Sequence, residues 1–132
     1  MRRERDAGAA VVEFALISVL LVLLLFGVIQ VGVYFYARNI VSAAAADAAR
    51  YAAAAGVPSS AGAARAEQMI ARALGSGQGS SITCTSGPGT DSGSGLPVTT
   101  VHCVGRMRAL LTTVAIPLTL DSTSSALKES AP

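Results

Sequence analysis

The sequence has few of the residues on which most catalytic and metal-binding sites depend. It contains two cysteines, one histidine and no tryptophan, and charged residues make up only 14%, against roughly 25% in soluble domains. Two cysteines and one histidine are too few for a four-ligand zinc site within one chain. The net charge of +2 also argues against a nucleic-acid-binding protein, which needs clustered basic charge.

The sequence motifs of several enzyme classes are missing as well. There is no Walker A loop, no GxGxxG after a strand, no HExxH and no GxSxG. His102 and Cys103 are adjacent, but neighbours in a strand point to opposite faces of a sheet, so they make a poor nucleophilic dyad. We therefore expect no enzyme, no metal site and no cofactor.

What the sequence does have is one long apolar run, residues 14–37, which holds 24 residues without a charge. A helix of that length spans roughly 36 Å, and the hydrocarbon core of a bilayer is about 30 Å thick. Residues 20–26 are apolar at every position, so this helix has no polar face and must lie in lipid or be deeply buried. The rest of the chain is too small to bury it, which favours a transmembrane helix.

The residues that flank this run predict its orientation. Arg2, Arg3 and Arg5 precede it, and the positive-inside rule places them in the cytoplasm. An interfacial aromatic belt at residues 34–36, followed by Arg38, closes the run. The C-terminal part should then lie outside the membrane. A secretory signal peptide is the alternative, although its apolar region is usually about 7–15 residues long.

Glu13 is a single carboxylate among apolar residues, where a charge at mid-bilayer costs about 2.5–3.5 kcal/mol. One interpretation is that it lies near the interface and extends out to water. The other interpretation starts from Gly8: if the chain is cut after Gly8, Ala9 becomes the first residue and Glu13 the fifth. The carboxylate then stands one helical turn from a new α-amino group, its own or that of a neighbouring subunit.

The N-terminal residues carry a resemblance to a known family. A basic leader, then GAAVVEF at residues 8–14 and a long apolar helix, resembles the prepilin-peptidase site of type IV pilins, and residues 9–16 (AAVVEFAL) resemble TadE-like proteins of the bacterial Tad/Flp branch. Further similar stretches are Phe26-Gly27, Tyr36-Ala37, residues 48–52 (AARYA) and residues 117–120 (PLTL).

The resemblance implies a role and a set of partners. It implies a structural minor pilin or pseudopilin of a Tad/Flp-type pilus or a type II/IV-related secretion system. Cleavage by a prepilin peptidase would fall between Gly8 and Ala9, and Glu13 with Phe14 would serve assembly. The implied partners are the membrane, the peptidase, other pilins and the pilus assembly platform. The chain would lie in the cell membrane and then enter or prime a pilus.

The remainder of the chain predicts a small α+β, pilin-like domain. The first helix should run over about residues 9–55, because residues 38–55 are rich in alanine, the strongest helix former. We expect a second helix over 61–74, capped by Ser59 or Ser60, and then a flexible loop over 75–95, where 13 of 21 residues are Gly or Ser. Strand candidates of a short antiparallel sheet are residues 82–85, 98–104 and 111–120.

Three segments follow from this layout: a basic leader (1–8), the long helix (9–55) and an extracytoplasmic domain (56–132). Cys84 and Cys103 each fall in a strand candidate, and two cysteines in an oxidising location usually pair. A disulfide between them would stabilise a thin core by on the order of 3 kcal/mol in the chain-entropy model.

Two other functions fit part of the pattern. A plain single-pass anchor with a ligand-binding domain predicts an intact Met1 and no special need for Glu13. A small secreted effector predicts cleavage by signal peptidase near Ala45 and a soluble product.

Overall fold

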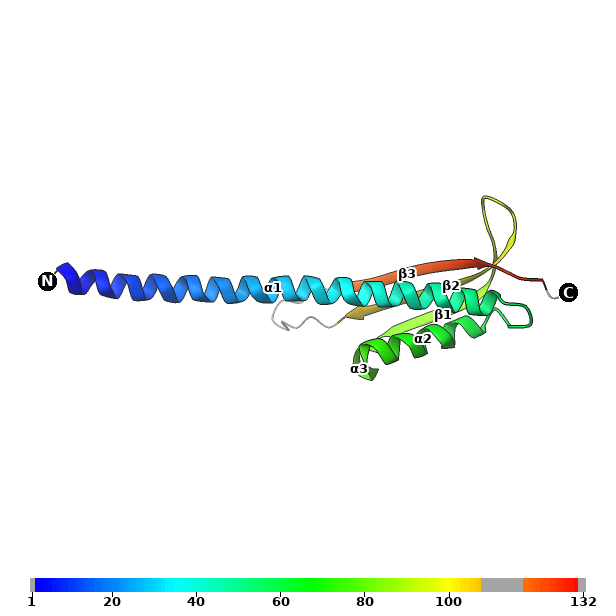
Figure 1. The fold of residues 1–132 in the computed structure, drawn as a ribbon, viewed down its shortest axis with the longest axis horizontal. Coiled ribbons are helices and arrows are strands. Elements are labelled where there is room, and N and C mark those ends of the chain that lie inside the picture. Colours follow the sequence, from blue (N-terminus) through cyan, green and yellow to red (C-terminus); the bar gives the residue numbers. More distant parts are fainter. Residues whose placement is uncertain (1, 108–117, 131–132) are drawn as a thin grey trace. The chain divides into compact units, whose positions relative to one another are not determined.

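The computed structural model describes residues 2–107 and 118–130, and for residues 2–7 it describes the backbone only. The chain forms two units, one up to Val33 and one from Tyr34 onward. The described elements are α1 (Arg2–Ala53), α2 (Ala61–Leu74), α3 (Ser76–Gly79), β1 (Ile82–Thr90), β2 (Pro97–Met107) and β3 (Leu118–Leu127), shown in Figure 1. A long apolar helix, a second helix and an antiparallel sheet confirm the α+β, pilin-like layout.

Helix α1 begins earlier than the sequence predicts, at Arg2 instead of about Ala9. The basic leader contains three arginines and one glutamate, which are good helix formers, and one glycine weakens a helix by only about 1 kcal/mol. Gly8 therefore does not interrupt the helix. At the other end α1 stops at Ala53, two residues before the expected end, and the positive φ of Gly56 (77°) turns the chain away.

The second half of α1 buries a stripe of small residues in the core of the unit that starts at Tyr34. The helical spacing of the sequence predicts one stripe formed by Ile40, Ala44, Ala48, Tyr51 and Ala55. Of these, Ala44 and Ala48 are buried, but Tyr51 is 47% exposed and Ala55 is exposed. The stripe therefore lies on a slightly different face. Its buried members are Ala37, Val41, Ala44, Ala45, Ala48, Ala49, Ala52 and Ala53.

Helix α2 has the bounds that the sequence predicts, and Gly75 (φ 81°) ends it. Its expected cap is wrong: Ser60 holds the N-cap position in a helical conformation, without a side-chain hydrogen bond. The spacing of Asp47 and Arg50, three residues apart on α1, predicts a pair within this helix, but Asp47 makes a contact between helices instead. Arg65 of α2 lies 3.3 Å from Asp47, and its guanidinium also lies over the Tyr51 ring.

The sheet has the order β1-β2-β3 with both pairs antiparallel. The Gly/Ser-rich residues 75–95 were predicted to be mostly loop, but they contain α3 and the nine-residue strand β1. The composition of β1 does not favour a strand, but pairing with β2 supplies its backbone hydrogen bonds. Such context often outweighs strand propensity. The third strand was expected over 111–120. Residues 111–117 of it lie outside the described residues, and β3 starts at Leu118.

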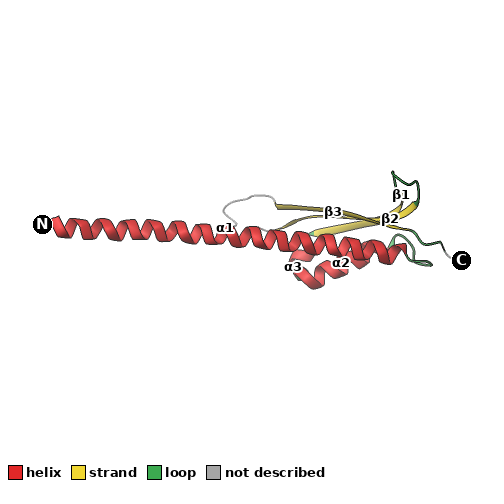
Figure 2. Cartoon of the chain, turned by 45° about the horizontal axis from the view of Figure 1, so that its top comes forward, coloured by secondary structure: helices red, strands yellow, loops and turns green. Residues whose placement is uncertain are grey.

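The two helices cover one face of the sheet, as Figure 2 shows for α2 and the second half of α1. Alternate residues of β2 face them and are buried, among them Thr99, Val101 and Cys103. Polar contacts fix this packing: the Thr99 hydroxyl donates to the Ala52 carbonyl (3.4 Å), and the Ala63 N–H donates to Ser86 Oγ (2.8 Å). The opposite face of the sheet carries polar side chains such as Thr100, His102 and Ser125.

Gly62 marks the closest approach of α2 to the rest of the core. A Cβ at this position would lie 2.8 Å from Val101 Cγ2 and 3.3 Å from the Ala48 carbonyl oxygen. We expect Gly62→Ala to lower stability by about 1 kcal/mol, since overpacking costs about 1–3 kcal/mol and the gain in helix propensity is at most about 1 kcal/mol. Faster hydrogen exchange of the β2 amides in the full chain would measure the loss.

The matched control for Gly62→Ala is Gly77→Ala in α3, where a Cβ would meet nothing within 4 Å. Exchange of the same β2 amides should not accelerate in this variant. Equal protection of the β2 amides in both variants would show that Gly62 is not needed for close packing.

Candidate functional site

The candidate site at the N-terminus is built on one helical segment. Gly8, Ala9, Glu13 and Phe14 all lie on α1, and their side-chain positions are exposed. Ala9 and Glu13 are four residues apart, so they lie one above the other on the same face. A Cβ at Gly8 would meet nothing within 4 Å, so the surroundings of that backbone are open.

Beyond Glu13 the helix exposes large apolar side chains on all sides. Phe14 is 73% exposed, and Ser18 satisfies its hydroxyl locally by donating to the Phe14 carbonyl (2.7 Å). By length and composition, the helix from Gly8 to Ala53 can cross a membrane, and none of its most apolar window is buried within the chain. An apolar surface of this size needs lipid or other helices around it.

Glu13 lies close to the start of this apolar surface. A carboxylate in such a place is expensive unless it is paired, and intramembrane carboxylates usually face a partner. No described side chain of this chain is recorded within ion-pair distance of it. The structure thus places Glu13 and Ala9 on one face, while the processing and assembly roles of the four residues stay predictions.

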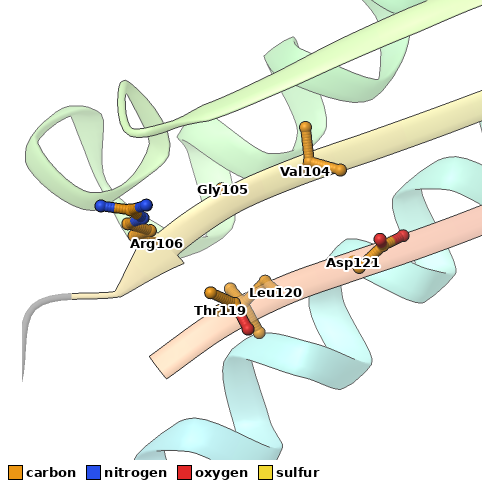
Figure 3. Close-up of a pocket in the computed structure, with 6 residues that line it drawn as sticks. All are labelled: Val104, Gly105, Arg106, Thr119, Leu120 and Asp121. Atoms are coloured by element: carbon orange, nitrogen blue, oxygen red, sulfur yellow. The ribbon is translucent and has the colours of Figure 1, made fainter. Parts of the chain in front are cut away.

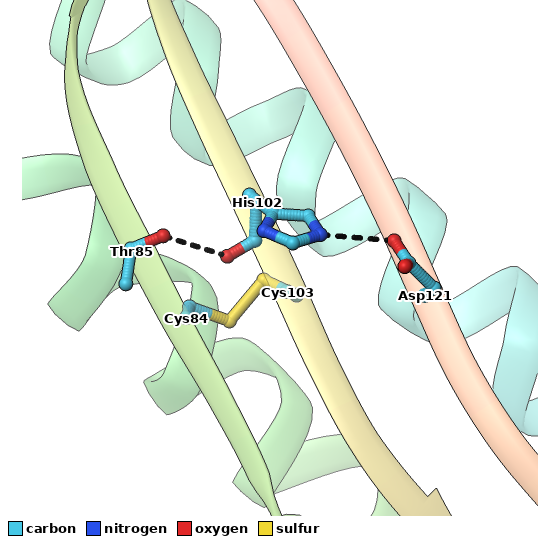
Figure 4. Close-up of polar contacts among 5 residues, drawn as sticks. All are labelled: Cys84, Thr85, His102, Cys103 and Asp121. Atoms are coloured by element: carbon cyan, nitrogen blue, oxygen red, sulfur yellow. Dashed lines mark hydrogen bonds and ion pairs between the residues drawn. A yellow bond between two sulfur atoms is a disulfide. The ribbon is translucent and has the colours of Figure 1, made fainter.

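The second candidate feature is the disulfide between Cys84 and Cys103. The two residues face each other across β1 and β2 with Cα atoms 4.1 Å apart, and both are buried. Figure 4 shows the bond beside the polar contacts of the same strands. The Cys84 N–H donates to Glu67 Oε1 (2.9 Å), which joins the bridge to α2. The disulfide thereby links β1 to β2 beneath the helices.

His102 lies next to Cys103 but on the other face of β2, as the strand period predicts. Its Nε2 lies 2.9 Å from Asp121 Oδ1, while the sulfur of Cys103 is bonded to Cys84 (Figure 4). The side chain of His102 is 43% exposed. Because the Cys103 sulfur is held in the disulfide, these two residues do not form a nucleophilic pair in this structure.

Sequence reasoning missed one cluster, at the end of α1. Nζ of Lys128, the only lysine of the chain, donates to the carbonyls of Ala52 (2.8 Å), Ala54 (3.2 Å) and Val57. The next residue, Glu129, donates its N–H to the Ala53 carbonyl (2.9 Å). A solitary lysine after a Ser/Thr-rich strand was the available signal, but its partners are more than 70 residues away in sequence.

Comparison with known protein families identifies the N-terminal part. Residues 8–50 match the family model of TadE-like proteins, which confirms the resemblance seen in the sequence. The comparisons with curated proteins and with solved structures each give no match. The matched segment contains the Gly8–Phe14 motif and the whole apolar run. A TadE-like segment implies a protein associated with a membrane and with a Tad pilus system.

Proposed function

We propose that this chain, whose residues 8–50 match the TadE-like family, is a minor pilin or pseudopilin of a Tad/Flp-type pilus or a related secretion system. Its role is structural and not catalytic. The apolar part of α1 anchors the chain in the cell membrane and packs with the helices of other pilins. The N-terminus lies in the cytoplasm, and the disulfide-linked domain faces the oxidising exterior.

The observation that carries this proposal is the position of Glu13. It is the only charge on α1 between Asp6 and Arg38, and it lies one helical turn after Ala9. A plain membrane anchor gains nothing from such a carboxylate, since burying it costs free energy. In a helix bundle, the same carboxylate can pair with an α-amino group and fix the register of neighbouring subunits.

The proposed register requires that a prepilin peptidase create the amino group at Ala9. The peptide bond between Gly8 and Ala9 lies inside α1, so the peptidase must locally unwind the helix to reach it. Apart from proline, glycine gives the lowest free-energy cost of this local unwinding, because it weakens a helix by about 1 kcal/mol relative to alanine. The absence of a side chain also lets a protease bind the backbone closely.

The test of this function is the mass of the mature chain. In cells that carry the pilus system, the wild-type chain should begin at Ala9, and Gly8→Val should leave a precursor that is eight residues longer. The substitution creates no clash within the chain, because nothing lies within 4 Å of a Cβ at Gly8. A processing defect would then report on the peptidase and not on folding.

Gly27→Val is the matched control, since Gly27 also lies on α1 with nothing within 4 Å of a Cβ. This variant should be processed like the wild type. A chain that still begins at Ala9 in Gly8→Val would contradict the proposal. An intact Met1 in the wild type would favour the plain anchor, and a start near Ala45 would favour the secreted effector.

A further inference from the structure

Three exposed arginines of the unit that starts at Tyr34 lie toward one of its two ends. Hydrogen bonds define the ends: the Tyr34 hydroxyl donates to the Thr119 carbonyl (3.3 Å), while the Glu129 N–H donates to the Ala53 carbonyl. Strand β3 therefore runs in the same direction as the second half of α1. We call the end with the Tyr34–Thr119 hydrogen bond the Tyr34 end. The other is the hairpin end, because the turn between β1 and β2 lies there.

Three arginines gather at the Tyr34 end. Arg38 follows Tyr34 by one helical turn, and Arg106 pairs with Thr119 in the sheet. Arg72 lies in the last turn of α2, next to Ala71, and Ala71 lines a depression together with Ile82. Ile82 in turn pairs with Gly105. Figure 1 shows the end of α2 and the start of β3 at the same end of the sheet. All three arginines are exposed.

The two carboxylates near this end have other partners. Glu67, which lines the same depression as Ala71, accepts from the Cys84 N–H, and Asp121 is paired with His102. Asp91 and Glu129 are at the hairpin end. Hydrogen bonds from the Ser94 hydroxyl and N–H hold the pKa of Asp91 below its usual range. Among the described residues, no carboxylate is recorded in an ion pair with Arg38, Arg72 or Arg106.

A pocket of about 460 Å³ opens at the Tyr34 end between β2 and β3. Figure 3 shows Arg106 at its outer rim, with the side chain directed away from Asp121, and Thr119 on the neighbouring strand. A guanidinium beside a hydroxyl is a suitable pair of donors for a phosphate oxygen.

We propose that Arg38, Arg72 and Arg106 form a basic rim that binds the phosphates of anionic lipid headgroups and holds the domain against the bilayer. The rim rests on the proposed membrane anchoring, because Tyr34 lies in the last turn of the apolar run and Arg38 follows that run directly. Aromatic residues 34–36 fit the interface, and basic residues next to a spanning helix attract anionic lipids. The hairpin end then lies away from the bilayer and is free to meet other subunits.

The full chain in lipid nanodiscs tests this rim. A lipid with a gadolinium chelate on its headgroup should broaden the amide signals of Arg106 and Thr119 several-fold more than that of Leu127, which is about 26 Å further along β3. Discs with about one third phosphatidylglycerol should show a larger difference than discs of phosphatidylcholine alone. Equal broadening at both positions, or no dependence on the anionic lipid, would overturn the proposal.

Variants and a free anion complete the test. Substitution of all three rim arginines by glutamine should reduce the broadening to its level in neutral discs, while Arg50→Gln, an exposed arginine of α1 outside the rim, should not. If inorganic phosphate shifts the Arg106 and Thr119 signals equally in neutral discs and anionic discs add nothing, the pocket binds free phosphate and the lipid assignment is wrong. A chain that does not stay with the discs contradicts the membrane anchoring itself.

Discussion

Glu13→Gln should leave membrane insertion intact and abolish pilus assembly. Within a lone helix the substitution is favourable, because burying an amide costs less than burying a carboxylate. Within an assembled bundle it is unfavourable, because the α-amino group of Ala9 keeps its charge and loses its partner. Removing one partner of a buried ion pair costs about 3–5 kcal/mol, enough to reduce association more than a hundredfold. Co-purification with other pilins and counts of pili measure the effect.

Two controls separate the charge of Glu13 from its shape. Glu13→Asp keeps the charge with a shorter side chain and should retain part of the assembly. Ser18→Ala removes the next polar group of α1, whose hydroxyl bonds only within its own helix, and should assemble normally. If Glu13→Gln assembles as well as the wild type, Glu13 is an interfacial residue that reaches water, and the register argument fails.

The elements that could be predicted from the sequence are those with a strong local signal. The apolar run of α1 and the alanine-rich stretch after it leave little choice but helix, and the bounds of α2 follow from its periodicity and from Gly75. Cys84 and Cys103 are the only two cysteines of the sequence, so their pairing could be predicted without excluding another pair. The TadE-like segment was recognisable because its motif has fixed spacing in a single helix.

The features that were missed depend on contacts between distant segments. The strand predicted over 82–85 is confirmed, but its continuation over 86–90, which contains two glycines and a proline, was missed because it depends on pairing with β2. The partner of Asp47 is Arg65 of another helix and not Arg50 of its own, which i,i+3 spacing cannot reveal. The predicted start of α1 near Ala9 is wrong because the predicted cleavage site after Gly8 is not a helix boundary: α1 begins at Arg2.

The same limitation applies to the candidate sites. The Gly8–Glu13 motif is local, and it could be located from the sequence. The basic rim joins residues of α1, α2 and β2 that are up to 68 positions apart, and in the sequence each of its arginines is an isolated charge. The Lys128 cluster could not be predicted from the sequence for the same reason. Its acceptors are backbone carbonyls, which no side chain in the sequence marks.

Lys128→Met should destabilise the domain by about 2 kcal/mol, because hydrogen bonds to charged groups contribute about 1.5–3 kcal/mol and the abandoned carbonyls are partly buried. The last carbonyls of a helix have no partner within the helix, and here the ammonium supplies one. Methionine keeps the length and apolar character of the stem but has no donors. Hydrogen exchange of the β2 amides in the full chain should accelerate about 30-fold, since 1.4 kcal/mol corresponds to a factor of ten.

Lys128→Arg and Arg50→Met show whether geometry or charge matters at this position. The ammonium directs three donors toward the carbonyls of Ala52, Ala54 and Val57, and the planar guanidinium of arginine does not match that arrangement. Lys128→Arg should therefore recover only part of the stability. Arg50 is an exposed cation in the last turn of α1, so Arg50→Met should lose only the interaction with the helix dipole, about 0.3–1 kcal/mol. If Arg50→Met and Lys128→Met accelerate exchange equally, Lys128 acts as a general positive charge near the helix end and not as the donor that closes it.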